Sequence, residues 1–88
     1  MDILYVFNFE RKHLEKAVVR FRHSLASVAD KNVRVCVSNN SDECILSQIE
    51  DVADNLAYVH RPYTGQFSRA HGINFGVRSL VRSEYFII

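Results

Sequence analysis

The sequence predicts an α/β domain in which a parallel β-sheet carries helices on both faces. Short apolar runs alternate with longer segments of helical periodicity, in the order strand, helix, strand, helix, strand, helix, strand. This alternation is typical of right-handed strand-helix-strand crossovers. The 88 residues suit one small domain, and 48% hydrophobic with 24% charged residues is an ordinary globular composition. With no linker or repeat, residues 1–88 are expected to form a single domain.

The first strand and the first helix have the clearest patterns. Residues 3–9 form a nearly unbroken apolar and aromatic run, too short to span a membrane and typical of a strand covered on both faces. Residues 11–28 have apolar positions at helical spacing with charged residues between them, which predicts an amphipathic helix. Its buried stripe consists of Leu14, Val18, Phe21, Leu25 and Val28.

The second strand and helix follow the same scheme. Residues 33–37 are short and β-branched, which predicts a strand, and residues 38–42 are turn and helix-capping types. Asn40 with Glu43 three residues later resembles a capping box, so a helix is expected to begin there and to stop near Asn55. Its apolar stripe consists of Ile45, Ile49, Val52 and Ala53.

The last third predicts a strand at residues 56–59, a loop at 60–65, a helix at roughly 67–81 and a fourth strand at 85–88. Gly72 and Gly76 lie four residues apart on that helix, and we expect them to let it approach the sheet closely. The chain ends on the apolar fourth strand, so we expect it to be part of a longer protein.

Charge and cysteine usage restrict the class of partner and the compartment. A net charge of +1 gives no general field that attracts nucleic acid or an anionic membrane. Cys36 and Cys44 occur in a chain without a leader pattern, so we expect reduced thiols and a cytoplasmic location. The four histidines and two cysteines have no zinc spacing, which predicts no metal site in this chain. No glycine-rich phosphate motif is present.

Candidate binding residues lie in the loops that follow the strands, because ligands of open parallel sheets bind outside the carboxyl ends of the strands. Two of the expected helices begin with basic residues, Arg11 to His13 on the first and Arg69 on the third. Acidic residues are favourable there, so a bound phosphate or diphosphate would compensate the mismatch. Alternatively, these are solvated surface cations that cost only about a few tenths of a kcal/mol.

Four segments together resemble glycosyltransferases of the GT-A fold, family 2-like. Residues 7–11, Phe-Asn-Phe-Glu-Arg, are similar to the family's first strand end, and 37–41, Val-Ser-Asn-Asn-Ser, to its second. Residues 66–76 resemble the Phe-Asn-Arg-Ala-x-x-Leu-Asn-x-Gly segment of galactosyltransferase-like members. Residues 83–88 resemble the strand that leads into an Asp-x-Asp metal motif, which this chain does not contain.

The resemblance implies a Rossmann-like three-layer sheet of order 3-2-1-4, the nucleotide-binding half of a GT-A enzyme. The implied ligand is a nucleotide diphosphate sugar, most often a UDP-sugar, whose sugar passes to an acceptor. A divalent metal, Mn or Mg, and the catalytic residues are expected only in the full-length protein, so this segment alone is expected to be inactive. The implied nucleotide-binding residues are Asn8, Phe9, Glu10, Ser38, Asn39 and Arg69.

Other interpretations of these residues remain open. Ser38 stands where the family usually has the aspartate that reads uracil, which leaves the base unassigned. Phe9 could instead cover the core, and Ser38 and Asn39 could serve only a turn. The alternative function is a non-catalytic Rossmann-like module that binds a nucleotide or a protein.

The fourth strand also predicts self-association. In the expected order it is an edge strand without a charge, proline or bulge to protect it. Pairing across a two-fold axis is self-complementary. We therefore expect a dimer or a larger assembly through Tyr85, Phe86, Ile87 and Ile88.

Overall fold

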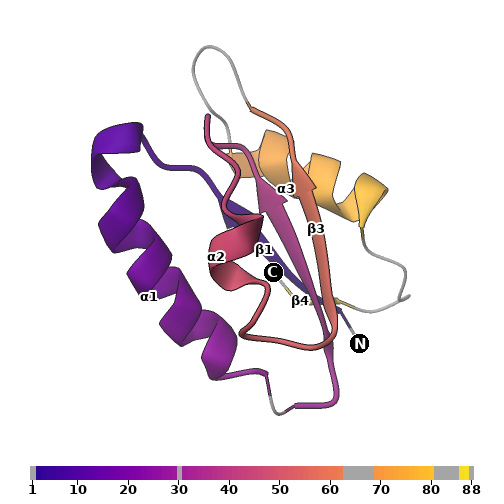
Figure 1. Ribbon diagram of the computed structural model, residues 1–88. Helices are drawn as coiled ribbons and strands as arrows, with labels where there is room; N and C mark the ends of the chain where they lie inside the picture. Colours follow the sequence, from indigo (N-terminus) through magenta and orange to yellow (C-terminus); the bar gives the residue numbers. More distant parts are fainter. Residues whose placement is uncertain (1, 30, 63–68, 81–85, 88) are drawn as a thin grey trace.

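The computed structural model describes residues 2–29, 31–62, 69–80 and 86–87. It confirms a small α/β fold with a parallel sheet and helices (Figure 1). Predicted features at residues 63–68, 81–85 and 88 lie outside the described residues. The elements are β1 (Asp2–Phe7), the 3₁₀ helix η1 (Arg11–His13), α1 (Leu14–Ala26), β2 (Arg34–Asn39), α2 (Leu46–Ile49), β3 (Leu56–His60), α3 (Arg69–Ser79) and β4 (Phe86–Ile87).

All strand pairs in the described sheet are parallel. β1 pairs with β2 from Asp2↔Arg34 to Phe7↔Asn39, and β2 pairs with β3 as far as Asn39↔His60. The two residues of β4 pair with the first residues of β1, so the strands lie side by side in the order β3-β2-β1-β4. Tyr85 and Ile88 are not described, and self-association through residues 85–88 stays a prediction.

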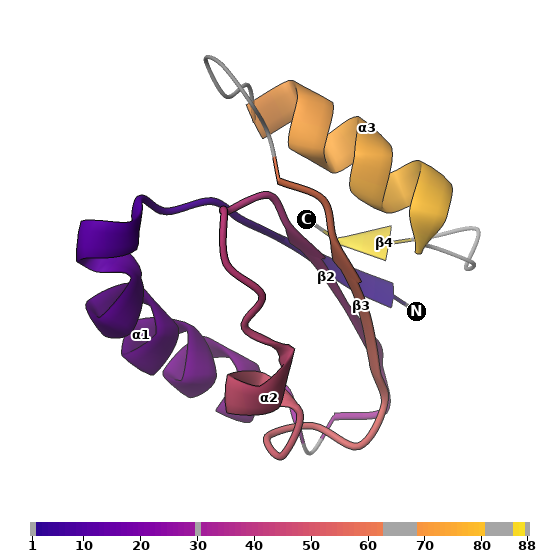
Figure 2. The same ribbon diagram turned by 45° about the horizontal axis from the view of Figure 1, so that its top comes forward.

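The sheet separates two apolar cores, because alternate residues of a strand point to opposite faces. α1 and α2 lie on one face and α3 on the other (Figure 2). The larger core joins Phe7, Val35 and Val37 to the predicted stripe of α1 and to Ile45 and Ile49. The smaller core joins Leu4 and Cys36 to α3 and Leu80. None of the helices in the described residues has the length and apolar character needed to cross a membrane.

The second helix is much shorter than predicted, and its expected capping box is wrong. β2 extends through Asn39, and α2 begins only at Leu46, with Ile45 as its N-cap residue and no capping side chain. The Asn40 side chain is used elsewhere: its Nδ2 donates to the carbonyl oxygen of Arg61 at 3.0 Å. A tertiary hydrogen bond between loops has therefore replaced the local cap that the sequence pattern indicated.

Gly76 has the packing role that the sequence predicted. It is buried in α3, and a Cβ placed there would lie 2.7 Å from Leu4 Cδ1 and 3.3 Å from Ser38 Cβ. Leu4 is only 1% exposed, so its side chain has little room to move away. The glycine thus allows α3 to lie directly against β1 and β2.

Replacing Gly76 by alanine is expected to destabilise the fold, although alanine is the better helix former. Helix propensity favours alanine by about 1 kcal/mol, whereas overpacking a closed core costs about 1–3 kcal/mol. We expect a net loss of about 1 kcal/mol in the free energy of unfolding, measured by urea denaturation. Ser79→Ala, at an exposed position of the same helix, is the control. An unchanged or raised stability of Gly76→Ala would show that Leu4 can repack.

Candidate functional site

The carboxyl ends of β1 and β2 are joined by hydrogen bonds between the loops that follow them. The Asn40 amide nitrogen donates to the carbonyl oxygen of Phe7 at 2.7 Å. The Phe9 amide nitrogen donates to Ser41 Oγ at 2.8 Å. These bonds fix the backbone of the Phe9 loop against the Ser41 turn, so two of the predicted binding loops lie together.

The end of β3 is joined to the same turn. The Arg61 amide nitrogen donates to the Asn39 carbonyl oxygen at 2.9 Å, and His60 Nε2 lies 2.7 Å from the Ser41 carbonyl oxygen. Together with the bond from Asn40 Nδ2 to Arg61, these contacts tie the three strand ends into one edge. We call this cluster, residues 8–10, 38–41 and 60–61, the carboxyl edge.

Asn39 is the centre of a buried hydrogen-bond network. Its Nδ2 donates to the Glu43 carbonyl oxygen at 2.8 Å and to the Tyr58 hydroxyl at 2.9 Å, and its Oδ1 accepts from the Ser41 amide at 2.9 Å. Asn39 and Ser38 are both 0% exposed. The Asn39 side chain therefore holds the turn in place, and the Ser38 hydroxyl lies 3.4 Å from Asn40 Oδ1. Their direct contact with a nucleotide stays a prediction.

Tyr58 is part of this network, a role that its sequence pattern does not indicate. Its hydroxyl accepts from the Ile45 amide at 3.1 Å and lies 3.5 Å from Cys44 Sγ. Burial raises the pKa of Tyr58, and the hydrogen bond from Tyr58 lowers the pKa of the exposed Cys44 thiol. The strand pattern marks Tyr58 only as an apolar position, because its hydroxyl partners come from distant residues.

Phe9 is an exposed aromatic residue of the carboxyl edge. Its side chain is 45% exposed, and its ring lies 4.8 Å from the Phe7 ring between centroids, in a tilted arrangement. Asn8 is half-buried and Glu10 is exposed. Phe9 therefore rests on the core with its inner side and offers its outer side to solvent.

The basic residues near this edge differ in how they are compensated. Arg11 Nε pairs with Glu43 Oε1 at 2.7 Å, and Lys12 Nζ lies 3.4 Å from Glu10 Oε2. The carboxylates of Glu43 and Glu10 therefore partly compensate the positive charge of these two residues. Arg69 is the exposed first residue of α3, whose first turn contains no acidic residue. Within the described part of the chain, Arg69 makes no ion pair.

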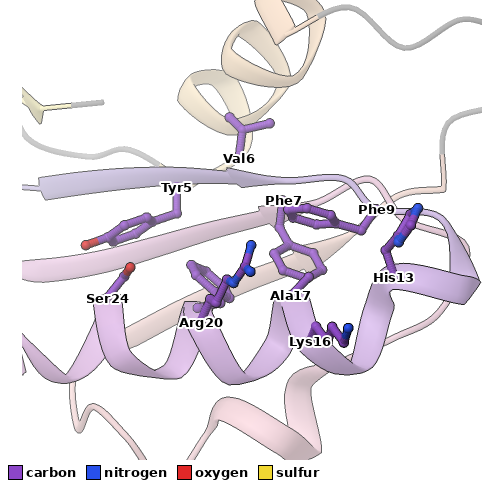
Figure 3. Close-up of a pocket in the computed structure, with 10 residues that line it drawn as sticks. Tyr5, Val6, Phe7, Phe9, His13, Lys16, Ala17, Arg20 and Ser24 are labelled. Atoms are coloured by element: carbon purple, nitrogen blue, oxygen red, sulfur yellow. The ribbon is translucent and has the colours of Figure 1, made fainter.

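A groove along β1 and α1 was also missed by the sequence analysis. It has a volume of about 500 Å³, and its walls carry aromatic rings from β1 and basic side chains from α1 (Figure 3). Two sequence signals could have indicated it: aromatic residues at every second position, Tyr5, Phe7 and Phe9, and basic ones at 16 and 20 on one helix face. The sequence pattern places Tyr5 and Phe7 in a covered strand and the basic residues between the apolar positions of the helix, and it relates only Phe9 to a binding site.

Comparisons with known proteins leave the family of this chain open. No family model, curated protein or solved structure matches the sequence or the fold. Within the described ranges, no three or more His, Cys, Asp and Glu side chains come together as a group that could hold a metal ion. The site is therefore interpreted from its own geometry and from the sequence resemblance.

Proposed function

We propose that this chain is the nucleotide-sugar-binding part of a GT-A glycosyltransferase, family 2-like, with a Rossmann-like sheet. In the whole enzyme it would bind a nucleoside diphosphate sugar for transfer of the sugar to an acceptor. The observation that carries the proposal is the exposed Phe9 ring, held at the carboxyl edge of a parallel sheet. In open α/β sheets this edge is where ligands bind.

The nucleobase would stack on Phe9. The ring is supported from below by Phe7, and its backbone is fixed by the bond to Ser41 Oγ, so little ordering is needed when a base arrives. Asn8 and Glu10 precede and follow Phe9 in the chain and would offer amide and carboxylate groups to the base edge or the ribose. Asn39 would act indirectly, because its Oδ1 holds the Ser41 turn that supports the Phe9 loop. Ser38 would act through Asn40, whose Oδ1 lies 3.4 Å from the Ser38 hydroxyl.

The diphosphate would lie toward Arg69. An arginine at the beginning of a helix adds a planar donor fork to the backbone amide groups of the first turn, a combination that suits phosphate oxygens. Arg11 and Lys12 contribute less to this proposal, because each already has a carboxylate within ion-pair distance.

A metal has no proposed place among the residues described. The resemblance implies a divalent cation, but the described side chains offer no group that fits one. We therefore derive no step through a metal and name no catalytic residue. The chemistry proposed for this chain is recognition and orientation of the nucleotide.

Uridine diphosphate is expected to bind with a Kd of millimolar order, since one stacking ring and one arginine supply only a few kcal/mol. In ¹⁵N NMR titrations, the amide signals of Asn8, Phe9 and Arg69 should shift. Phe9→Ala should weaken binding by about tenfold, because stacking on an aromatic ring contributes about 1–3 kcal/mol per base. Val19→Ala is the matched control, because Val19 is an exposed apolar side chain on the outside of α1.

Several results would reject the proposal. Shifts confined to the helix exteriors, or equal affinities for the Phe9→Ala and Val19→Ala variants, would exclude nucleotide recognition at the carboxyl edge. Inorganic pyrophosphate that binds as tightly as uridine diphosphate would show that the base is not recognised. These outcomes would favour the alternative, a module without glycosyltransferase activity.

A further inference from the structure

The groove between β1 and α1 has the size of a small-molecule site. Its volume of about 500 Å³ lies within the range of about 300–1,000 Å³ that is typical of ligand pockets. The residues around it come from β1, the Phe9 loop, η1 and α1 (Figure 3). It extends from Phe9 at the carboxyl edge to Ser24, so most of it lies away from the nucleotide residues proposed above.

The inner wall of the groove is a continuous set of aromatic rings. Tyr5 meets Phe21 edge-on with 5.4 Å between centroids, and Phe7 stacks on Phe21 at 5.0 Å. Phe9 continues the set at 4.8 Å from Phe7. Aromatic groups prefer such edge and offset contacts, which contribute more than burial of area alone. The wall therefore suits a flat aromatic body better than an aliphatic chain.

The outer wall is basic. Lys16 and Arg20 lie four residues apart on α1, on the same side of the helix, and His13 precedes Lys16 by three residues. All three side chains are exposed, and within the described ranges none makes a hydrogen bond or an ion pair. Among the described residues that line the groove, none has a carboxylate side chain. The nearby Glu15 faces a separate shallow hollow that Lys16 and Arg20 also border.

We propose that this groove binds a small aromatic anion, such as an aromatic carboxylate or sulfonate. Its ring lies against Tyr5 and Phe21, and its anionic group lies between Lys16 and Arg20. Apolar walls shield the ring from water, and the anionic group supplies the negative charge that the described residues do not place beside Lys16 and Arg20. The residues that hold the aromatic anion, Tyr5, Phe21, Lys16 and Arg20, are not part of the proposed nucleotide site, although Phe9 borders both sites. Binding of the aromatic anion is therefore a second function of the same domain.

The probe for this site is 2-naphthalenesulfonate, followed by ¹⁵N NMR. We expect saturable shifts of the amides at Tyr5, Lys16, Arg20, Phe21 and Ser24. The double variant Lys16→Gln/Arg20→Gln should bind about tenfold more weakly, because two partly exposed ion pairs are lost. The double variant Lys31→Gln/Arg78→Gln removes the same charges at exposed positions outside the groove and should bind as the wild type does.

A second variant tests the cavity itself. Ser24 is exposed at the far end of the groove, so Ser24→Trp should fill the space without unfolding the protein and should abolish binding. The proposal is overturned if neutral 2-naphthylmethanol binds as tightly as the sulfonate, or if both double variants weaken binding equally. It is also overturned if the groove amides shift with protein concentration alone, which would indicate a second copy in the groove. Uridine diphosphate affinity should be unchanged in Ser24→Trp, so the two sites fail independently.

Discussion

Replacing Arg34 by methionine is expected to destabilise the protein by about 3 kcal/mol, the lower end of the range for breaking a buried ion pair. Arg34 Nη1 lies 3.2 Å from Asp2 Oδ2 and donates to the Leu80 carbonyl oxygen at 2.6 Å. The Asp2 residue is only 2% exposed. The variant leaves a buried carboxylate without this cation and removes the side-chain donor from the carbonyl beyond the end of α3.

Urea denaturation measures this effect, with Arg20→Met as the matched control at an exposed position, where a change within about 0.5 kcal/mol is expected. A domain with only about 5–15 kcal/mol of stability could lose its fold in the single variant. The double variant Asp2→Asn/Arg34→Met therefore accompanies it and should recover part of the loss, since no buried charge remains. A single variant that loses less than about 1 kcal/mol contradicts the role given to this pair.

Replacing Asn39 by alanine should cost about 2–4 kcal/mol, because each buried partner left without a hydrogen bond costs about 1–3 kcal/mol. The side chain serves the Glu43 carbonyl, the Tyr58 hydroxyl and the Ser41 amide, and its residue is 0% exposed. Tyr58 keeps its bond from the Ile45 amide, which limits the loss.

Hydrogen exchange at the Ser41 amide gives a local measure, because this amide loses its acceptor in the Asn39→Ala variant. Exchange there should accelerate more than exchange at Val37, in the middle of β2. Asn32→Ala, in an exposed turn, is the control and should change stability by no more than about 0.5 kcal/mol. Equal effects of the two substitutions would show that Asn39 is an ordinary strand residue.

Both variants bear on the proposed nucleotide site in different ways. Arg34 lies at the end of the sheet opposite the carboxyl edge. Its loss should therefore lower stability, whereas the fraction of the protein that remains folded should still bind uridine diphosphate. Asn39 supports the turn that holds the Phe9 backbone through Ser41 Oγ. Its loss should therefore weaken uridine diphosphate binding as well as stability.

The sequence by itself determined the class of fold and the members of the core. The β-branched and aromatic runs form parallel strands, and the apolar stripe of α1 packs as predicted. Both follow from the pattern of apolar residues, because burial of apolar side chains is the dominant favourable contribution to folding. The packing role of Gly76 was also predicted correctly. Glycine is a poor helix former, so its presence inside a helix indicates that a side chain there would meet a close neighbour.

The tertiary structure decided where the polar side chains act. Asn40 matched a helix cap by its spacing, but its amide bonds to Arg61, a residue 21 positions away. Ser38 and Asn39 matched a binding turn, but both are buried within the protein's own hydrogen bonds. The groove exists because β1 and α1 lie side by side with Tyr5 and Arg20 on facing walls. Hydrogen bonds and charge pairs depend on distances between remote residues, which local periodicity does not contain.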